Sequence, residues 1–349
     1  MVKRLAFAVP GDLATPTGGY AYDRQIIAEL TRLDWIIDVI DLGDGFPRAD
    51  AKMRIAAQAL LEKTPEGCPI VIDGLAFGVL PEAAASLQTR NPLIALVHHP
   101  LAFESGLSRA DAETFRASEK AALAYARRVI VTSVATAYLL TTGYDVPADR
   151  ITVARPGSEP VAPARGSSDG IVRLLAVGSL VPRKGYDVLI AALVTLADLP
   201  WRLTIAGDGE RDPATAANIR NEIARSGLNE RVTVAGAVSP GRLAELYIAA
   251  DLFVLASRYE GYGMAYAEAI AYGLPVIGTT AGAIPDTLSR DAAILVAPDD
   301  ATALAHALRR LIANKDERRR MAAAARAAAA RLPKWRDSAA LFASAIEAA

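Results

Sequence analysis

The sequence predicts an α/β protein built on two doubly wound parallel sheets. Short apolar runs alternate with longer segments of helical pattern along the chain. The runs fall into two sets of about six, and a stretch rich in Pro, Gly, Ser and Ala at residues 158–170 separates the sets. Strands that alternate with helices form parallel sheets, and 349 residues suffice for two domains with separate cores.

The predicted strands have the length and composition of buried parallel strands. A helix is predicted over 20–33, and another over the alanine-rich tract 321–332, because alanine has the highest helix propensity. The first set of strands covers residues 5–9, 37–42, 70–73, 93–98, 129–133 and 151–154. The second set covers residues 172–177, 202–206, 232–235, 252–256, 275–278 and 293–296.

The composition excludes several classes of function. The formal net charge is −1, so no overall field would recruit nucleic acid or anionic lipid. A single cysteine, Cys68, excludes an intramolecular disulfide and a cysteine-based metal cluster. The apolar run before Pro10 predicts a first strand sooner than a signal peptide, and no stretch approaches the ~18 apolar residues of a membrane span. We therefore expect a cytoplasmic protein.

One stretch, residues 257–286, organises the rest of the chain. It follows the predicted strand at 252–256 and contains Gly261 and Gly263 before an alanine-rich helix that begins near Met264. The glycines let the backbone approach a ligand, and the helix directs its free N–H groups and positive dipole end to the same place. Such a site predicts an anionic guest.

Two carboxylates accompany this anion site. Glu260 lies in the loop and Glu268 on the second turn of the helix. Carboxylates beside an anion site indicate a ligand that also offers hydroxyls. A nucleotide sugar meets both demands, because its diphosphate suits the amides and its ribose and hexose hydroxyls suit the carboxylates. Without the flanking motifs, both side chains would be ordinary surface charges.

The spacing Glu260-x7-Glu268, followed by Gly-Leu-Pro-Val at 273–276, resembles the donor-site signature of retaining glycosyltransferases of family 4. The resemblance implies the GT-B fold, in which two Rossmann-like domains face a deep interdomain cleft. It also implies that Glu260 binds hydroxyls of the transferred sugar and that Glu268 holds the ribose. The diphosphate would be bound by the amides of Tyr262 and its neighbours Gly261, Gly263 and Met264.

The same resemblance divides the chain. An acceptor-binding domain is expected at 1–157, a linker at 158–170 and a donor-binding domain at 171–332. The sequence breaks after Leu332, at a proline. The C-terminal helix, residues 335–349, is expected to cross back to the first domain, as the last helix of GT-B enzymes does.

A basic motif opens the second domain. Residues 176–193 resemble the family pattern in which a strand ends in Gly-Arg-Leu and a Lys-Gly pair precedes a helix. Arg183 and Lys184 would lie beside the diphosphate and offset the charge that grows on it as it leaves. The usual arginine after Gly178 is Ser179 here. Either Arg183 takes over that contact, or the site binds more weakly than is typical.

Two further segments of the second domain match the family in part. Gly207 and Gly209 resemble a Gly-x-Gly turn that shapes the pocket wall, and we discount a metal motif there because family 4 enzymes generally need no divalent ion. Relatives hold the nucleobase at the segment corresponding to 236–238, largely through backbone groups, so the base is not readable. Gly282 matches a Gly-Gly-x-x-Glu motif whose second glycine and glutamate are absent.

The first domain contributes a glycine pair and two histidines. Gly18 and Gly19 follow the first strand, and in family 4 such a pair lets the loop approach the donor phosphates and the acceptor. His98 and His99 end the fourth strand, where open α/β sheets bind ligands. His98 aligns with a family histidine that reaches the transferred sugar, and His99 is expected near the acceptor. Adjacent residues point to opposite sides, so the pair does not predict a metal site.

The resemblance implies a metal-independent, retaining hexosyltransferase with catalytic His98, Arg183, Lys184 and Glu260. The donor would be GDP-mannose or UDP-glucose, no cofactor is expected, and the hydroxyl acceptor is a glycan, a lipid-linked molecule or a small molecule. Residues 1–157 carry slightly more acidic than basic side chains, so at most peripheral membrane contact is expected. Two alternatives stay open: a non-hydrolysing sugar-nucleotide epimerase, and a non-catalytic nucleotide-sugar-binding protein.

Overall fold

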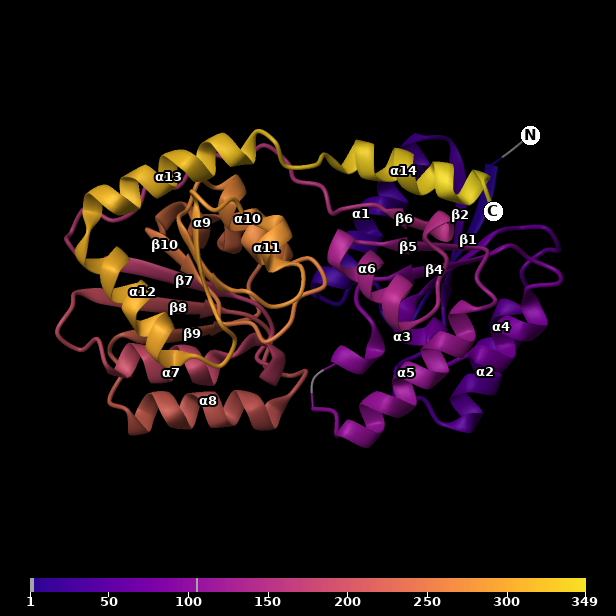
Figure 1. Cartoon of the computed structure of the whole chain (residues 1–349), viewed down its shortest axis with the longest axis horizontal. Coiled ribbons are helices and arrows are strands. Elements are labelled where there is room, and N and C mark those ends of the chain that lie inside the picture. The colour runs from indigo at the N-terminus through magenta and orange to yellow at the C-terminus, as the bar shows by residue number, and fades with distance from the viewer. Residues whose placement is uncertain (1–2, 105) are drawn as a thin grey trace. The chain divides into compact units, whose positions relative to one another are not determined.

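The protein is described by a computed structural model of residues 3–104 and 106–349, which form two compact units (Figure 1). The first unit comprises Met1–Gly157 and Pro333–Ala349, and the second comprises Ser158–Leu332. Each unit has its own hydrophobic core around its own sheet. None of the described helices is long and apolar enough to span a membrane.

The sheet of the first unit has six strands in the order β2-β1-β3-β4-β5-β6, and all neighbouring strands are parallel. The strands are β1 (Lys3–Val9), β2 (Trp35–Asp41), β3 (Ile70–Asp73), β4 (Leu93–Val97), β5 (Arg128–Val131) and β6 (Ile151–Val153). The helices are α1 (Gly18–Arg32), α2 (Ala51–Leu61), α3 (Gly74–Phe77), α4 (Pro81–Leu87), η1 (Leu101–Phe103), α5 (Arg109–Leu123), α6 (Val134–Gly143), η2 (Ala148–Arg150) and α14 (Trp335–Glu347).

The sheet of the second unit also has six parallel strands, in the order β12-β11-β10-β7-β8-β9. The strands are β7 (Val172–Val177), β8 (Trp201–Ala206), β9 (Val232–Gly236), β10 (Leu252–Val254), β11 (Val276–Thr279) and β12 (Ala293–Val296). The helices are η3 (Pro182–Lys184), α7 (Tyr186–Val194), α8 (Pro213–Arg225), α9 (Pro240–Ala249), α10 (Met264–Ala271), α11 (Ile284–Thr287), α12 (Ala301–Ala313) and α13 (Lys315–Ala329). All twelve predicted strands are confirmed, with ends that differ by at most two residues.

The strand orders place one switch point in each sheet. In the first sheet the order reverses at β1, between β2 and β3, and in the second it reverses at β7, between β8 and β10. Ligands of open parallel sheets bind outside the carboxyl ends of the strands at such points. The segments after β1 and β3, and those after β7 and β10, are therefore where binding residues should gather.

Side chains in the sequence fix where several helices begin. Thr17 caps α1, Ser108 forms a capping box with Asp111 at α5, and Asp300 and Asn314 cap α12 and α13. Each cap satisfies a backbone N–H group that the first helical turn leaves without a partner. The predicted helix over the alanine-rich tract is confirmed by α13.

The C-terminal helix belongs to the first unit. After Pro333 the chain forms α14, yellow in Figure 1, which packs against α1, β5 and β6. The hydroxyl of Ser338 donates to the carbonyl of Arg155, and Phe342 stacks on Phe7 of β1. Residues 158–170, the expected linker, form neither helix nor strand.

Candidate functional site

The first part of the site in the second unit follows β7. Here η3 presents Arg183 and Lys184 just before α7 begins. Gly185 separates the two helices with a φ of 65°, and a Cβ atom at this position would lie 2.0 Å from the carbonyl oxygen of Ala256. Only glycine permits this turn. The basic pair is therefore held against the segment that follows β10.

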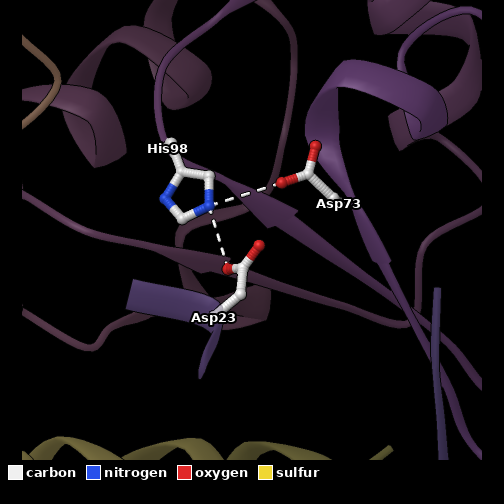
Figure 2. Close-up of side chains that lie close together, drawn as sticks. All are labelled: Asp23, Asp73 and His98. Atoms are coloured by element: carbon white, nitrogen blue, oxygen red, sulfur yellow. Dashed lines mark hydrogen bonds and ion pairs between the residues drawn. The ribbon is translucent and has the colours of Figure 1, made fainter. Parts of the chain in front are cut away.

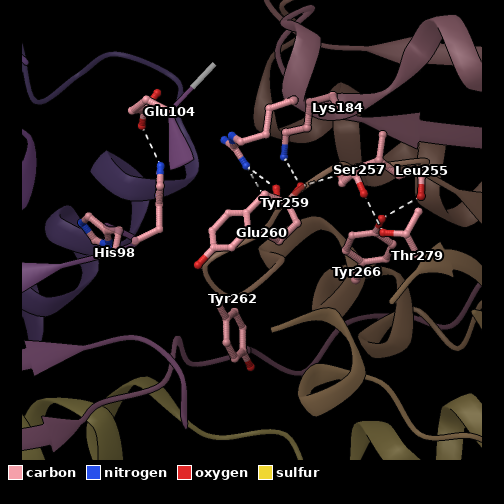
Figure 3. Close-up of polar contacts among 12 residues, drawn as sticks. His98, Glu104, Lys184, Leu255, Ser257, Tyr259, Glu260, Tyr262, Tyr266 and Thr279 are labelled. Carbon is pink, nitrogen blue, oxygen red and sulfur yellow. Dashed lines mark hydrogen bonds and ion pairs between the residues drawn. The ribbon is translucent and has the colours of Figure 1, made fainter. Parts of the chain in front are cut away.

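The second part is the loop 257–263 after β10, which carries Glu260. Its side chain is 7% exposed and accepts hydrogen bonds from three side chains (Figure 3). The Nζ of Lys184 donates to Oε1 at 2.7 Å, and the hydroxyl of Ser257 donates to the same oxygen at 2.6 Å. The guanidinium of Arg183 donates to Oε2 at 3.2 Å. We call these four residues the Glu260 cluster.

The Glu260 cluster combines two cations with one carboxylate. Burial opposes ionisation of Glu260, but the charges of Lys184 and Arg183 and the hydrogen bonds from Lys184 and Ser257 outweigh it and lower the pKa of Glu260 to about 2. Burial also lowers the pKa of Lys184, and the charge of Glu260 opposes this. At neutral pH Glu260 is ionised, and the cluster keeps one positive charge in excess.

The loop ends at the N-terminus of α10. Gly263 is the N-cap residue with a φ of 91°, and no side chain caps the helix. Two contacts with the segment around α11 fix the loop: Thr287 donates from its hydroxyl to the carbonyl of Tyr262 at 2.6 Å, and the N–H of Ala283 donates to the carbonyl of Glu260 at 2.9 Å. The helix end and the Glu260 cluster are thus held together in one anion-attracting region.

Glu268 is fixed separately, on the second turn of α10. The buried hydroxyl of Tyr247 in α9 donates to Oε2 of Glu268 at 2.9 Å, and the Tyr247 ring stacks on Tyr272 at 4.8 Å. Burial raises the pKa of Glu268, whereas the hydrogen bond from Tyr247 and the charge of Lys184 lower it. Because the charge of Lys184 acts on both carboxylates, Glu260 and Glu268 belong to one electrostatic environment.

Three other predicted residues of the second unit line the neighbouring turns. A Cβ atom at Gly207 would lie 1.8 Å from the carbonyl oxygen of Gly178, so the turn after β8 packs directly on the turn after β7. At Gly209 a Cβ atom would lie 3.2 Å from the methyl group of Ala216. Ser179 is partly buried, and its carbonyl accepts the N–H of Val181.

The site in the first unit centres on His98, which follows β4. Its Nε2 atom lies 3.1 Å from Oδ1 of Asp23 in α1 and 3.4 Å from Oδ2 of Asp73 at the end of β3 (Figure 2). Both carboxylates are buried, and the His98 side chain is 18% exposed. The three residues come from the elements around the switch point of the first sheet. We call them the His98 triad.

The His98 triad favours a protonated imidazole. Burial disfavours the imidazolium form, but the charges of Asp23 and Asp73 and their hydrogen bonds outweigh it and raise the pKa of His98 to about 10. Burial raises the pKa of Asp23 to about 6, an effect that the charge of His98 limits. At neutral pH the ring is therefore a cation between carboxylates.

The glycine pair lies beside this triad. Gly18 and Gly19 begin α1, and a Cβ atom at Gly19 would lie 3.4 Å from Cδ2 of His98. A longer side chain at Gly19 would cover the ring. His99 turns to a different partner, since its Nε2 lies 2.6 Å from Oε1 of Glu104. The two histidines thus have different partners.

The His98 triad is also the group that could hold a metal ion. Nε2 of His98 and one oxygen each from Asp23 and Asp73 lie within 4.8 Å of one another. Imidazole nitrogen with carboxylate oxygens is a donor set that Zn²⁺ and other transition metals accept. A metal ion would have to displace the proton on Nε2.

Sequence reasoning missed four side chains of these sites. Ser257 is the first residue after a predicted strand, and Asp73 is the last residue of another. Both positions could have indicated site residues, because ligands bind at the carboxyl ends of such strands. Asp23 lies on the helix face of Ile26 and Leu30, where a buried acid interrupts an apolar stripe. No local signal marks Tyr247, because it meets Glu268 only in the folded unit.

Comparison with known proteins identifies the second unit. Residues 164–328 match the family described as glycosyl transferases group 1. The D-inositol 3-phosphate glycosyltransferase of Xylanimonas cellulosilytica is 32% identical over 214 residues, which cover 56% of this chain and 51% of that protein. The chain spans about half the length of the curated relatives that it matches.

Solved structures match both units. Sucrose-phosphate synthase from Thermosynechococcus elongatus matches with a TM-score of 0.81 at 23% identity, and 98% of each chain is covered. HepE from Anabaena, solved in complex with UDP and glucose, matches with a TM-score of 0.77 at 19% identity, and the match covers 99% of this chain and 100% of HepE. The second unit therefore matches the group 1 glycosyltransferases over residues 164–328, and the chain has the GT-B fold.

Proposed function

We propose that the chain is a retaining glycosyltransferase that moves a hexose from a nucleoside diphosphate sugar to an acceptor hydroxyl. The observation that carries the proposal is the Glu260 cluster, in which a buried carboxylate fixes two cations next to the uncapped end of α10. This arrangement stands at the switch point of the second sheet, between the ends of β7 and β10.

The diphosphate would bind to the excess positive charge of this cluster. Arg183 can contact a phosphate with two N–H groups, whereas Lys184 acts as a point charge. The N–H groups of the first turn of α10 and its positive dipole end would add to the attraction. The Lys184 side chain is 14% exposed, so it is not fully shielded from a ligand.

The sugars would bind to the two carboxylates. Oε1 of Glu260 already accepts from Lys184 and Ser257, while among the described residues Oε2 accepts only from Arg183. An ionised carboxylate has about four acceptor positions, so Oε2 can accept one hexose hydroxyl. Glu268 has one oxygen held by Tyr247, and its other oxygen would accept from the ribose.

The chemistry would consist of positioning and charge stabilisation. The bond between the anomeric carbon and the diphosphate oxygen breaks, and the acceptor oxygen bonds to the same face of the sugar. The departing diphosphate takes the proton of the acceptor hydroxyl. Arg183, Lys184 and the end of α10 would stabilise the charge that develops on the diphosphate, and we propose that no metal ion is required.

For the donor we propose UDP-glucose, with GDP-mannose as the second choice. HepE, which shares the fold, is solved with UDP and glucose, and this supports the choice. In the first unit we propose that His98 contacts the transferred sugar. The acceptor remains a hydroxyl compound of unspecified class.

Two measurements test the proposal. Melting temperature would first be recorded with UDP, GDP and ADP, because a ligand that binds only the native state raises apparent stability. Transfer from the stabilising donor to a panel of hydroxyl acceptors would then be followed with and without EDTA, and the anomeric configuration of the product determined by NMR. An inverted product would overturn retention, and an epimerised donor formed without any acceptor would overturn transfer.

Lys184→Ala tests whether Lys184 stabilises the departing diphosphate. Loss of one group that stabilises a leaving anion lowers kcat about 10²–10³-fold. Lys315→Ala is the control, since Lys315 is an exposed lysine of the same unit. Wild-type turnover in Lys184→Ala, with Lys315→Ala also unchanged, would contradict the assigned role.

A further inference from the structure

His98 is held at one edge of its ring by two buried carboxylates. Asp73 caps α3, where its Oδ1 accepts the N–H of Leu75 at 2.8 Å, and its Oδ2 faces Nε2 of His98. Asp23 is fully buried on α1, and its Oδ1 faces the same nitrogen. One ring nitrogen thus faces two buried carboxylates, of which Asp73 is anchored by a backbone N–H group.

The opposite edge of the His98 ring, which carries Nδ1, faces neither of the two carboxylates (Figure 2). Figure 2 shows the second ring nitrogen of His98, Nδ1, turned away from Asp23 and Asp73. Within residues 3–104 and 106–349, no hydrogen bond to Nδ1 is present, and the ring retains 18% exposure. The backbone is fixed as well, since the hydroxyl of Thr132 donates to the His98 carbonyl at 3.2 Å. The Tyr22 ring packs against the His98 ring in a T-shaped arrangement, with ring centroids 5.4 Å apart.

We propose that Asp23 and Asp73 are positioning residues that hold His98 through Nε2–H and leave Nδ1–H as the one hydrogen-bond donor that the ring offers to a substrate oxygen. This inference rests on the proposed function, because it takes His98 as the group that meets the sugar. It adds the direction and the kind of that contact: His98 donates from Nδ1 and does not act as a proton acceptor.

The surrounding charges support a fixed cation. Asp23 and Asp73 are the carboxylates that face Nε2, and the charge of Arg24 acts on Asp23 without contacting the ring. The carboxylate of Glu104 is engaged with His99 instead. A ring that carries a full positive charge forms stronger hydrogen bonds to hydroxyl or phosphate oxygens than a neutral ring does.

NMR of the ring nitrogens in the full chain tests this directly. The chain has three histidines, so His98→Gln identifies the resonances of His98. In the wild type we expect both nitrogens of His98 to stay protonated from pH 6 to about pH 9. In Asp23→Asn and in Asp73→Asn, loss of one carboxylate should lower the midpoint of the His98 titration by about 1–3 pH units. Asparagine retains the side-chain shape and the helix cap, which favours folding.

Glu119→Gln is the matched control, because Glu119 is an equally buried carboxylate of the same unit whose hydrogen-bond partner is the N–H of Leu101. It should leave the His98 titration unchanged. A His98 titration near pH 6.5 in the wild type, or one that Asp23→Asn does not alter, would overturn the proposal. So would displacement of the Nε2 proton by added Zn²⁺, which would make the triad a metal site.

Turnover gives an independent readout. In Asp23→Asn, kcat should fall as pH rises through the lowered midpoint, while melting shifts with UDP, which report the second unit, stay as in the wild type. Absence of transfer by the wild type would refute the proposed function and leave the NMR result standing. Normal transfer with an unprotonated His98 would refute the positioning role alone.

Discussion

Replacing Glu260 by glutamine tests whether one carboxylate holds the basic pair in place. The Gln oxygen could still accept from Lys184 and Ser257, but the Gln amide would face the donor group of Arg183, which lies 3.2 Å from Oε2 of Glu260. Two cations would then share a buried site without a countercharge. Breaking a buried ion pair in this way costs roughly 3–5 kcal/mol.

The lowered pKa of Glu260 corresponds to a free energy of similar size. The surroundings lower the pKa of Glu260 from 4.5 to about 2, which corresponds to about 3 kcal/mol in favour of the ionised form. For a unit of the length of Ser158–Leu332, this is a decrease in melting temperature of ~6–12 °C. Because the folded pKa is depressed, the contribution is complete above about pH 5 and is lost as pH falls toward about 2.

The assay is thermal unfolding of wild type and Glu260→Gln at pH 7.5 and at pH 3.5, with and without UDP. Glu245→Gln is the control, because it breaks an exposed ion pair with Arg242 in the same unit and should cost at most about 1 kcal/mol. We expect the large difference at pH 7.5 to shrink at pH 3.5. UDP should raise the melting temperature of Glu260→Gln more than that of wild type, because the diphosphate supplies the missing negative charge.

Two outcomes would refute this reasoning. A loss of stability at pH 7.5 as small as that of Glu245→Gln would show that the cluster does not hold the loop. Equal stabilisation of both proteins by UDP would show that the diphosphate binds away from Arg183 and Lys184.

Two further predictions concern the supports of the site. Tyr247→Phe removes the hydrogen bond to Glu268, which is worth roughly 0.5–1.5 kcal/mol. KM for the donor should therefore rise about 2–12-fold, with kcat nearly unchanged. A fall in kcat without a rise in KM would contradict this prediction. Gly282→Ala would put a Cβ atom 2.2 Å from the carbonyl oxygen of Glu260 at a φ of 56°, so stability should fall by more than the ~1–3 kcal/mol expected from backbone strain alone. Gly227→Ala, at a φ of 67° in open space, measures that strain, and equal losses in the two variants would exclude the clash.

Most of the fold could be predicted from the sequence because both sheets are parallel. A strand that is buried on both faces is a continuous apolar run, and such runs are visible without knowledge of their partners. Strand ends were less certain, since the last apolar residue need not be hydrogen-bonded. For β10 the strand ends at Val254, whereas the run continues through Leu255, whose N–H still donates to the carbonyl of Ile277, and through Ala256.

The candidate site was predictable where its residues follow strands. Lys184 and Glu260 come after β7 and β10, which flank the switch point of the second sheet, and His98 comes after β4, the neighbour of β3 in the first sheet. Topology therefore brings them to the carboxyl edges of the sheets. What the sequence could not provide is the pairing of these residues. The hydrogen bonds of Lys184 to Glu260 and of His98 to Asp23 join residues 76 and 75 positions apart, and no local pattern encodes such contacts.

The most direct test of the central claim is a crystal structure of the protein with UDP. We predict density for the diphosphate within about 3.2 Å of the Nζ atom of Lys184 and of the first-turn amides of α10, with Glu268 on the ribose. Diphosphate density at any other place, with Lys184 still paired to Glu260 and out of contact with the diphosphate, would contradict the account.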